Sequence, residues 1–102
     1  MRTIGLEAKA SQVAETLRAV ANERRLLLLC HLVETGEASA TSLAEAVGLS
    51  TSALSQHLSK MRNEGLVTFR RDGQTLWYRI ADARIETLLS TLHNLYCRTQ
   101  RH

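Results

Sequence analysis

The segment from Ser50 to Gly65 constrains the fold more than any other part of the chain, because it has the pattern of one helix with two different faces. Leu54, Leu58 and Met61 recur at helical spacing and form a single apolar stripe. The other positions are mostly short uncharged hydrogen-bonding residues, which are weak helix formers, whereas a merely solvated face is usually built from Glu and Lys. We therefore predict a helix that packs on a core through one face and contacts a partner through the other.

The residue types on that second face favour DNA as the partner. Ser, Gln and His at the front of a helix, followed by Lys and Arg, suit contacts to base edges and phosphates in a major groove. This interpretation makes the segment a DNA recognition helix. Its predicted DNA-contacting residues are Ser50, Thr51, Ser52, Ser55, Gln56, His57, Lys60 and Arg62.

A short helix and a glycine turn precede the recognition helix. Ser42 and Glu45 have the spacing of a capping box, which predicts a helix from Ser42 to Val47 closed by Gly48. A short helix, a glycine turn and a second helix form a helix-turn-helix. The alternative is an ordinary helical hairpin that never touches DNA.

After Gly65 the period of the apolar pattern changes from helical to two. The stretches 66–71 and 74–80 alternate as β-strands do, and Asp72 and Gly73 between them favour a two-residue type I′ turn. The sequence therefore predicts a tight hairpin directly after the helix-turn-helix, in the place of a wing.

A two-residue loop at Asp72 and Gly73 would set Phe69 opposite Leu76 on the core face of the hairpin. The tip then carries Arg70, Arg71 and Gln74, which we expect to reach a phosphate backbone beside the recognition helix. The alternative is an exposed sheet edge that arginines keep soluble.

A helix capped by Asn22 and ended by Gly36 precedes this region. We expect Arg24 and Arg25 on it to be solvated, with contact to the DNA backbone as the alternative. Its predicted apolar stripe is Leu26, Leu29, Cys30 and Val33.

Amphipathic helices are also predicted at both ends of the chain. Residues 1–8 are expected to be a flexible tail, and 9–102 a single winged helix-turn-helix domain whose first helix starts near Lys9. Asp82 caps the last helix, whose apolar face is too wide for the surface helix of a monomer. We therefore expect a symmetric homodimer through the two terminal helices, presenting two recognition helices to palindromic double-stranded DNA. The wide face consists of Ile85, Leu88, Leu89, Leu92, Leu95 and Tyr96.

The composition is consistent with a DNA-binding domain and indicates the cellular compartment of the protein. The 102 residues are 44% apolar with net charge +3, and the basic excess lies in residues 50–102, which hold eight Lys or Arg against four Asp or Glu. There is no apolar run long enough to span a membrane and no signal-peptide pattern, so we expect a cytoplasmic protein. Two distant cysteines predict free thiols rather than a disulfide scaffold.

The predicted fold is thus mainly α with a small β-hairpin, in the order helix, helix, helix, helix, strand, strand, helix. This plan, together with A-N-E-R-R-L-L-L-L-C at 21–30, S-A-L-S-Q-H-L at 52–58, R-N-E-G-L-V at 62–67 and L-Y-C at 95–97, resembles the ArsR/SmtB family of bacterial repressors. Within it, the resemblance is to the thiol-sensing branch typified by BigR, SqrR and HlyU. The resemblance implies that Cys30 and Cys97 form a redox switch, with reactive sulfur species or oxidants as inducer.

Other functions have less support. The metal sites familiar in that family are absent, although a zinc or copper site made of Cys30, His31, His93 and Cys97 is an alternative. A winged helix that binds protein instead of DNA is another. No catalytic constellation or phosphate-cradling glycine loop occurs, so we expect neither an enzyme nor a cofactor. His93 is also a candidate to assist thiolate formation at Cys97.

Overall fold

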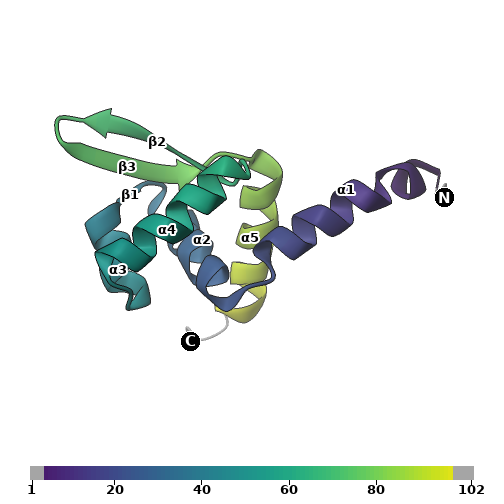
Figure 1. The fold of residues 1–102 in the computed structure, drawn as a ribbon. Coiled ribbons are helices and arrows are strands. Elements are labelled where there is room, and N and C mark those ends of the chain that lie inside the picture. Colours follow the sequence, from purple (N-terminus) through teal and green to yellow (C-terminus); the bar gives the residue numbers. More distant parts are fainter. Residues whose placement is uncertain (1–3, 98–102) are drawn as a thin grey trace.

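The computed structural model describes residues 4–97, which form a helical body with a long first helix and a β-hairpin projecting from it (Figure 1). The order of elements confirms the predicted winged helix-turn-helix, with one additional short strand that the sequence patterns did not indicate. The elements are α1 (Ile4–Val20), α2 (Glu23–Thr35), β1 (Ala38–Ser39), α3 (Ala40–Val47), α4 (Thr51–Asn63), β2 (Val67–Asp72), β3 (Thr75–Ile80) and α5 (Ala83–Tyr96). None of the helices described is long and apolar enough to cross a membrane.

The core lies where α2 to α5 meet the inner part of the hairpin. On α4 the predicted stripe is confirmed, because Leu54, Leu58 and Met61 are all buried. On α2 the stripe lies elsewhere: Leu28, Leu29 and Leu32 are fully buried. Three of the four predicted residues, Leu26, Cys30 and Val33, lie only at the edge of the core. Residues 26–30 are all apolar and fit several helical faces, so neighbouring elements select the face that is buried.

Side-chain caps fix the starts of the helices. Asn22, Ser50 and Asp82 accept backbone N–H groups as predicted. The cap of α3 differs from the prediction, because Ser39 Oγ accepts the Ser42 N–H at 3.2 Å and the helix begins at Ala40. Ser39 takes this role because its extended backbone in β1 leads directly into the helix, and such a cap is worth about 1 kcal/mol.

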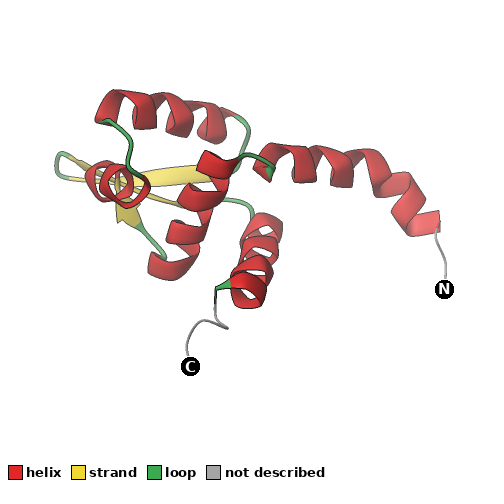
Figure 2. Ribbon diagram, turned by 90° about the horizontal axis from the view of Figure 1, so that it is seen from below, coloured by secondary structure: helices red, strands yellow, loops and turns green. Residues whose placement is uncertain are grey.

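Helix α1 is longer than the sequence suggested. It begins at Ile4, so residues 4–8 are helical rather than a tail, while residues 1–3 lie outside the described part. Leu6, Glu7 and Ala8 are good helix formers and extend the helix without needing tertiary contacts. Figure 2 shows α1 reaching away from the body, so most of its length is solvent-exposed.

The sheet is antiparallel with strand order β1-β3-β2, and the hairpin register differs from the prediction by two residues. Phe69 pairs with Tyr78 rather than Leu76, and the two rings meet edge to face at 5.4 Å between centroids. Asp72 pairs with Thr75 instead of lying in the loop. Side chains alternate with period two along a strand, so a slip of two residues leaves each on its predicted face.

Gly73 explains the shifted turn. The two-residue loop consists of Gly73 and Gln74, and Gly73 has φ +65°. Both tight hairpin turns need a positive φ at the first loop position, which glycine adopts without strain. Placing Gly73 first therefore extends β2 by one residue relative to the predicted turn.

Candidate nucleic-acid interface

The outward face of α4 carries the side chains predicted to read DNA. Because the opposite face of the helix is anchored in the core, these side chains are held on a rigid element. Ser50 has a structural task as well, since its Oγ accepts the Ala53 N–H at 3.2 Å. His57 is half-buried, and the exposed members of the predicted set on this segment are Ser50, Thr51, Ser52, Ser55, Gln56, Lys60 and Arg62. Their contacts with DNA stay a prediction.

A groove runs between α4 and the end of α1, with a volume of about 680 Å³. Gln56, His57 and Lys60 line its α4 side, while Arg18 and Asn22 line the side formed by α1 and the turn into α2. No local sequence pattern indicated that the end of α1 shares a surface with these α4 residues.

The wing holds Arg70, Arg71 and Gln74 as predicted, all exposed near its tip. Arg70, however, is already paired: its Nε and Nη2 donate to the two carboxylate oxygens of Glu37 at 2.7 and 3.0 Å. This hydrogen-bonded pairing lowers the pKa of the Glu37 carboxyl, so Glu37 stays ionised at neutral pH. The phosphate contact predicted for Arg70 therefore has a competitor inside the protein.

Arg62 at the end of α4 also has a partner. Its guanidinium carbon lies 4.4 Å from the centre of the Phe69 ring on β2, within the range of a cation–π interaction. This contact joins the recognition helix to the wing.

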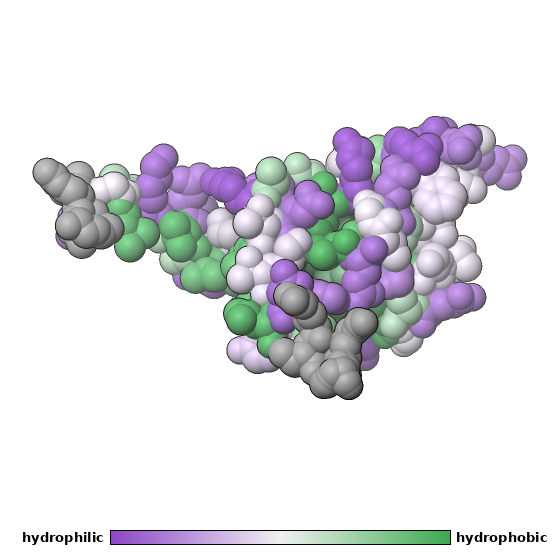
Figure 3. Space-filling model, turned by 180° about the vertical axis from the view of Figure 1, so that it is seen from behind, coloured by the Kyte–Doolittle hydropathy of each residue, from purple (hydrophilic) through white to green (hydrophobic). Residues whose placement is uncertain are grey.

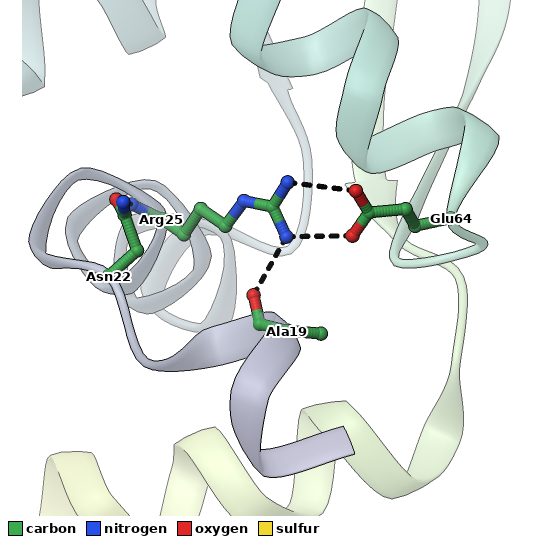
Figure 4. Close-up of polar contacts among 4 residues, drawn as sticks. All are labelled: Ala19, Asn22, Arg25 and Glu64. Atoms are coloured by element: carbon green, nitrogen blue, oxygen red, sulfur yellow. Dashed lines mark hydrogen bonds and ion pairs between the residues drawn. The ribbon is translucent and has the colours of Figure 1, made fainter. Parts of the chain in front are cut away.

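Arg24 and Arg25 are not merely solvated, contrary to the expectation from sequence. Arg24 Nη1 donates to the Val47 carbonyl at 3.1 Å. Arg25 forms a bidentate ion pair with Glu64, at 2.7 and 3.0 Å, and its Nη1 also donates to the Ala19 carbonyl at 2.8 Å (Figure 4). The prediction failed because these partners come from other helices, 6 to 39 residues away in sequence.

The two cysteines are free thiols in adjoining helices, Cys30 on α2 and Cys97 at the end of α5. Cys30 is half-buried and Cys97 is exposed. Burial raises the pKa of the Cys30 thiol, and the negative charges of Cys97 and Glu34 raise it further. The two thiols therefore lie on helices that pack together, and the exposed Cys97 thiol is the more accessible of the two.

The histidines near the cysteines have different surroundings. His93 Nε2 lies 2.8 Å from Glu34 Oε2, so its ring contacts a carboxylate on α2. His31 Nε2 is buried, and no group in the described part of the chain forms a hydrogen bond with it. Across residues 4–97, no three Cys, His, Asp or Glu side chains come together in a way that could hold a metal ion.

Three glutamates that pair with side chains of these sites could not be identified from the sequence. Glu34, Glu37 and Glu64 pair with His93, Arg70 and Arg25, which are 59, 33 and 39 residues away. No local spacing links residues so far apart, and only the charge of each glutamate was visible in the sequence.

A helix-turn-helix with an exposed polar recognition helix, followed directly by an antiparallel hairpin, defines the class of winged helix-turn-helix DNA-binding proteins. Comparison with known proteins agrees. Residues 22–68 match the family described as bacterial regulatory protein, arsR family. This chain belongs to that family, as the sequence resemblance indicated, and is a DNA-binding transcriptional regulator rather than an enzyme.

Its relatives match over nearly the whole chain. It is 44% identical to the HTH-type transcriptional regulator YgaV of Escherichia coli (strain K12), over 90% of this chain and 93% of that protein. It is 38% identical to the transcriptional activator HlyU of Vibrio cholerae, over 94% and 88% respectively. The crystal structure of the transcriptional repressor BigR from Xylella fastidiosa superposes with a TM-score of 0.84 at 34% identity, covering 95% of this chain and 98% of that one.

Proposed function

We propose that this chain is a homodimeric transcriptional repressor that binds a palindromic operator in the cytoplasm and releases it when Cys30 and Cys97 become linked. The observation that carries the proposal is the placement of the two free thiols on helices that pack together, Cys30 on α2 and Cys97 at the end of α5. In the reduced state both thiols are free and the dimer represses. A persulfide or another oxidant is the inducer.

The outward faces of α4 and of the wing supply the contacts to the operator. Ser52, Ser55, Gln56 and His57 enter the major groove and read base edges, while Ser50 and Thr51 at the helix start lie close to the backbone. The phosphate contacts come from Lys60, Arg62, Arg70, Arg71 and Gln74. Each phosphate that these residues neutralise adds about 0.9 to the slope of log affinity against log salt concentration.

The dimer is supported by apolar surface on the terminal helices. Leu6, Val13 and Leu17 on α1 are 59%, 41% and 51% exposed, and Leu95 and Tyr96 on α5 are 62% and 73% exposed. Figure 3 shows apolar surface along one edge of the projecting α1 and continuing onto the body beside it. Residues of this kind are costly to leave in water, and a second copy of the chain would cover them.

The thiol chemistry assigns different roles to the two cysteines. The exposed Cys97 thiolate attacks the sulfane sulfur of a small-molecule persulfide, becomes a persulfide and releases the thiol of the donor. Cys30 then attacks the Cys97 sulfur, forming a disulfide and expelling hydrogen sulfide. The two electrons lost by the protein thiols thus reduce the sulfane sulfur, and a second donor molecule would leave one extra sulfur in the bridge.

Such a link fixes the position of α2 relative to α5. Because α5 belongs to the proposed dimer contact and α2 adjoins the helix-turn-helix, the link would alter the spacing of the two recognition helices. A change in that spacing weakens binding to two half-sites fixed on one duplex.

Single cysteine variants test the switch. We expect reduced Cys97→Ser to bind a palindromic promoter duplex like the wild type but to stay bound when glutathione persulfide is added. Fluorescence anisotropy measures binding, and intact mass on the same sample reports loss of two hydrogens or gain of sulfur. Release of Cys97→Ser by the persulfide would place the switch elsewhere.

The same assay separates the alternatives. Release by zinc but not by the persulfide would favour a metal-responsive repressor. Failure to bind any palindromic promoter fragment at low salt would favour a winged helix that contacts protein.

A further inference from the structure

We propose that Arg25 is a positioning residue for DNA recognition: held between Glu64 and the Ala19 carbonyl, it fixes the angle of α4 relative to α1 and so the half-site spacing that the dimer reads. The inference rests on the proposed function, in which α4 enters the major groove and α1 contributes to the dimer. We call the three residues Ala19, Arg25 and Glu64 the Arg25 clamp.

The clamp joins three helices through one guanidinium group (Figure 4). Arg25 lies in the first turn of α2, Ala19 lies near the end of α1, and Glu64 is the C-cap residue of α4. Nη1 donates both to Glu64 Oε1 at 2.7 Å and to the Ala19 carbonyl at 2.8 Å, while Nη2 donates to Glu64 Oε2 at 3.0 Å. The end of the recognition helix and the end of α1 are therefore tied to one planar group.

Few packing contacts besides this one position α1 against the body. Among the α1 side chains whose exposure is described, Val20 alone is fully buried, so little packing holds the helix against the body. Only Ala21 and Asn22 separate α1 from α2. A hydrogen bond to the last turn of α1 is then a principal constraint on the direction in which that helix leaves the body.

The geometry of the pair favours stiffness. The Arg25 side chain is only 13% exposed, whereas the Glu64 side chain is 42% exposed. A bidentate arginine–carboxylate pair fixes both distance and orientation, and the third hydrogen bond leaves the guanidinium little freedom to rotate. Lysine would keep the charge but lose this planar fork.

The clamp also borders the groove that contains Gln56, His57 and Lys60. These side chains project from the same helix whose end Arg25 holds. In a dimer built on α1 and α5, a small change of angle between α1 and α4 is transmitted to both recognition helices, because each copy carries the same clamp. Half-sites lie about one helical turn of DNA apart, so a change of angle alters which spacing fits.

Glu64→Gln gives a test in which electrostatics and positioning predict opposite results. Removing a negative charge beside a DNA-binding surface strengthens binding to any duplex if electrostatics alone operate. We expect instead that affinity for the preferred palindrome falls about tenfold, with little change on a scrambled duplex. Preference for one half-site spacing over spacings one base pair longer or shorter shrinks accordingly.

The probe is a palindromic duplex selected by the wild-type protein from a random half-site library, with its two spacer variants and a scrambled control. Glu45→Gln is the matched variant, because Glu45 is an exposed glutamate of α3 with no ion pair in the described structure. It should keep the wild-type spacing preference. Arg25→Lys should lose the preference as Glu64→Gln does, although its charge is retained, and Glu64→Asp should lie between.

Circular dichroism melting of each variant without DNA separates positioning from folding, since a purely structural role lowers the melting temperature and leaves the spacing preference of the folded protein intact. A wild-type spacing preference in both Glu64→Gln and Arg25→Lys would overturn the proposal. If the wild-type protein itself selected no palindrome, the proposed binding of palindromic DNA by a dimer would be wrong. The positioning role of Arg25, which rests on it, would then be wrong as well.

Discussion

Glu37, in the turn before β1, accepts two hydrogen bonds from the guanidinium of Arg70 on the wing. Arg70 Nε lies 2.7 Å from Glu37 Oε2, and Arg70 Nη2 lies 3.0 Å from Glu37 Oε1. Arg70 Nη1 also lies 3.9 Å from Asp72 Oδ2, so two negative groups surround this arginine. The net positive potential of the wing is consequently weaker than its arginines suggest. An exposed ion pair of this kind is readily exchanged for another anion, and a DNA phosphate is such an anion.

Glu37→Gln should therefore strengthen binding to every duplex several-fold, without changing sequence discrimination. The reason is that Arg70 no longer has to leave a carboxylate before it contacts a phosphate. Anisotropy titrations with one palindromic and one unrelated duplex measure the gain. In the Arg70→Ala background the gain should vanish, and its persistence there would show that the removed charge acts without Arg70.

Gln56→Ala is expected to abolish discrimination between bases while leaving non-specific affinity unchanged. Gln56 is exposed on α4, and a bidentate amide contact to a base is worth about 1–3 kcal/mol of discrimination. Arg71→Ala serves as the contrast: it should weaken all duplexes alike and reduce the salt slope by about 0.9. Equal losses of specific and non-specific binding in Gln56→Ala would contradict base reading by this residue.

Leu17→Asp should convert the dimer to a monomer that remains folded. Leu17 is 51% exposed on α1, so a charge there costs the isolated protomer little but would be desolvated in the dimer. Sedimentation velocity reports the change in mass, and circular dichroism reports the fold. Ser11→Asp, which places the same charge on a different face of α1, should stay dimeric. A dimeric Leu17→Asp would locate the interface elsewhere.

Alkylation of Cys30 by iodoacetamide should require a higher pH than an ordinary thiol. Its pKa is raised, first by burial and then by the charges of Cys97 and Glu34, so it keeps its proton where a free thiol has lost it. For the same reason the free energy of unfolding should fall as pH rises above the ordinary thiol pKa, since the folded state binds more protons than the unfolded state there. Pulsed alkylation and peptide mapping give the profile.

The control for this profile is the urea-unfolded protein, in which Cys30 should be alkylated at the pH of an ordinary thiol. If Cys30 in the folded protein matched its unfolded profile, neither its burial nor the charge of Cys97 would be acting on the thiol.

Most of the architecture was predictable from local patterns. The stripe of Leu54, Leu58 and Met61, the caps at Asn22 and Asp82, and the change of period after Gly65 are read over a few residues. They define the order of elements and the outward face of the recognition helix. The predicted hairpin register was wrong by two residues. Asp72-Gly73 and Gly73-Gln74 are both acceptable turns, and pairing along the strands selects between them.

The pairs that engage side chains of the candidate site could not be predicted from the sequence. Arg25 with Glu64, Arg70 with Glu37, and His93 with Glu34 join elements 33 to 59 residues apart. A charge in a sequence specifies no partner, because Coulomb attraction depends on distance in space and that distance exists only once the helices have packed. The sequence by itself determined the winged helix-turn-helix and the side chains on the outward faces of α4 and the wing. Tertiary packing decided which of those side chains already have partners within the protein, and it placed the two cysteines on helices that pack together.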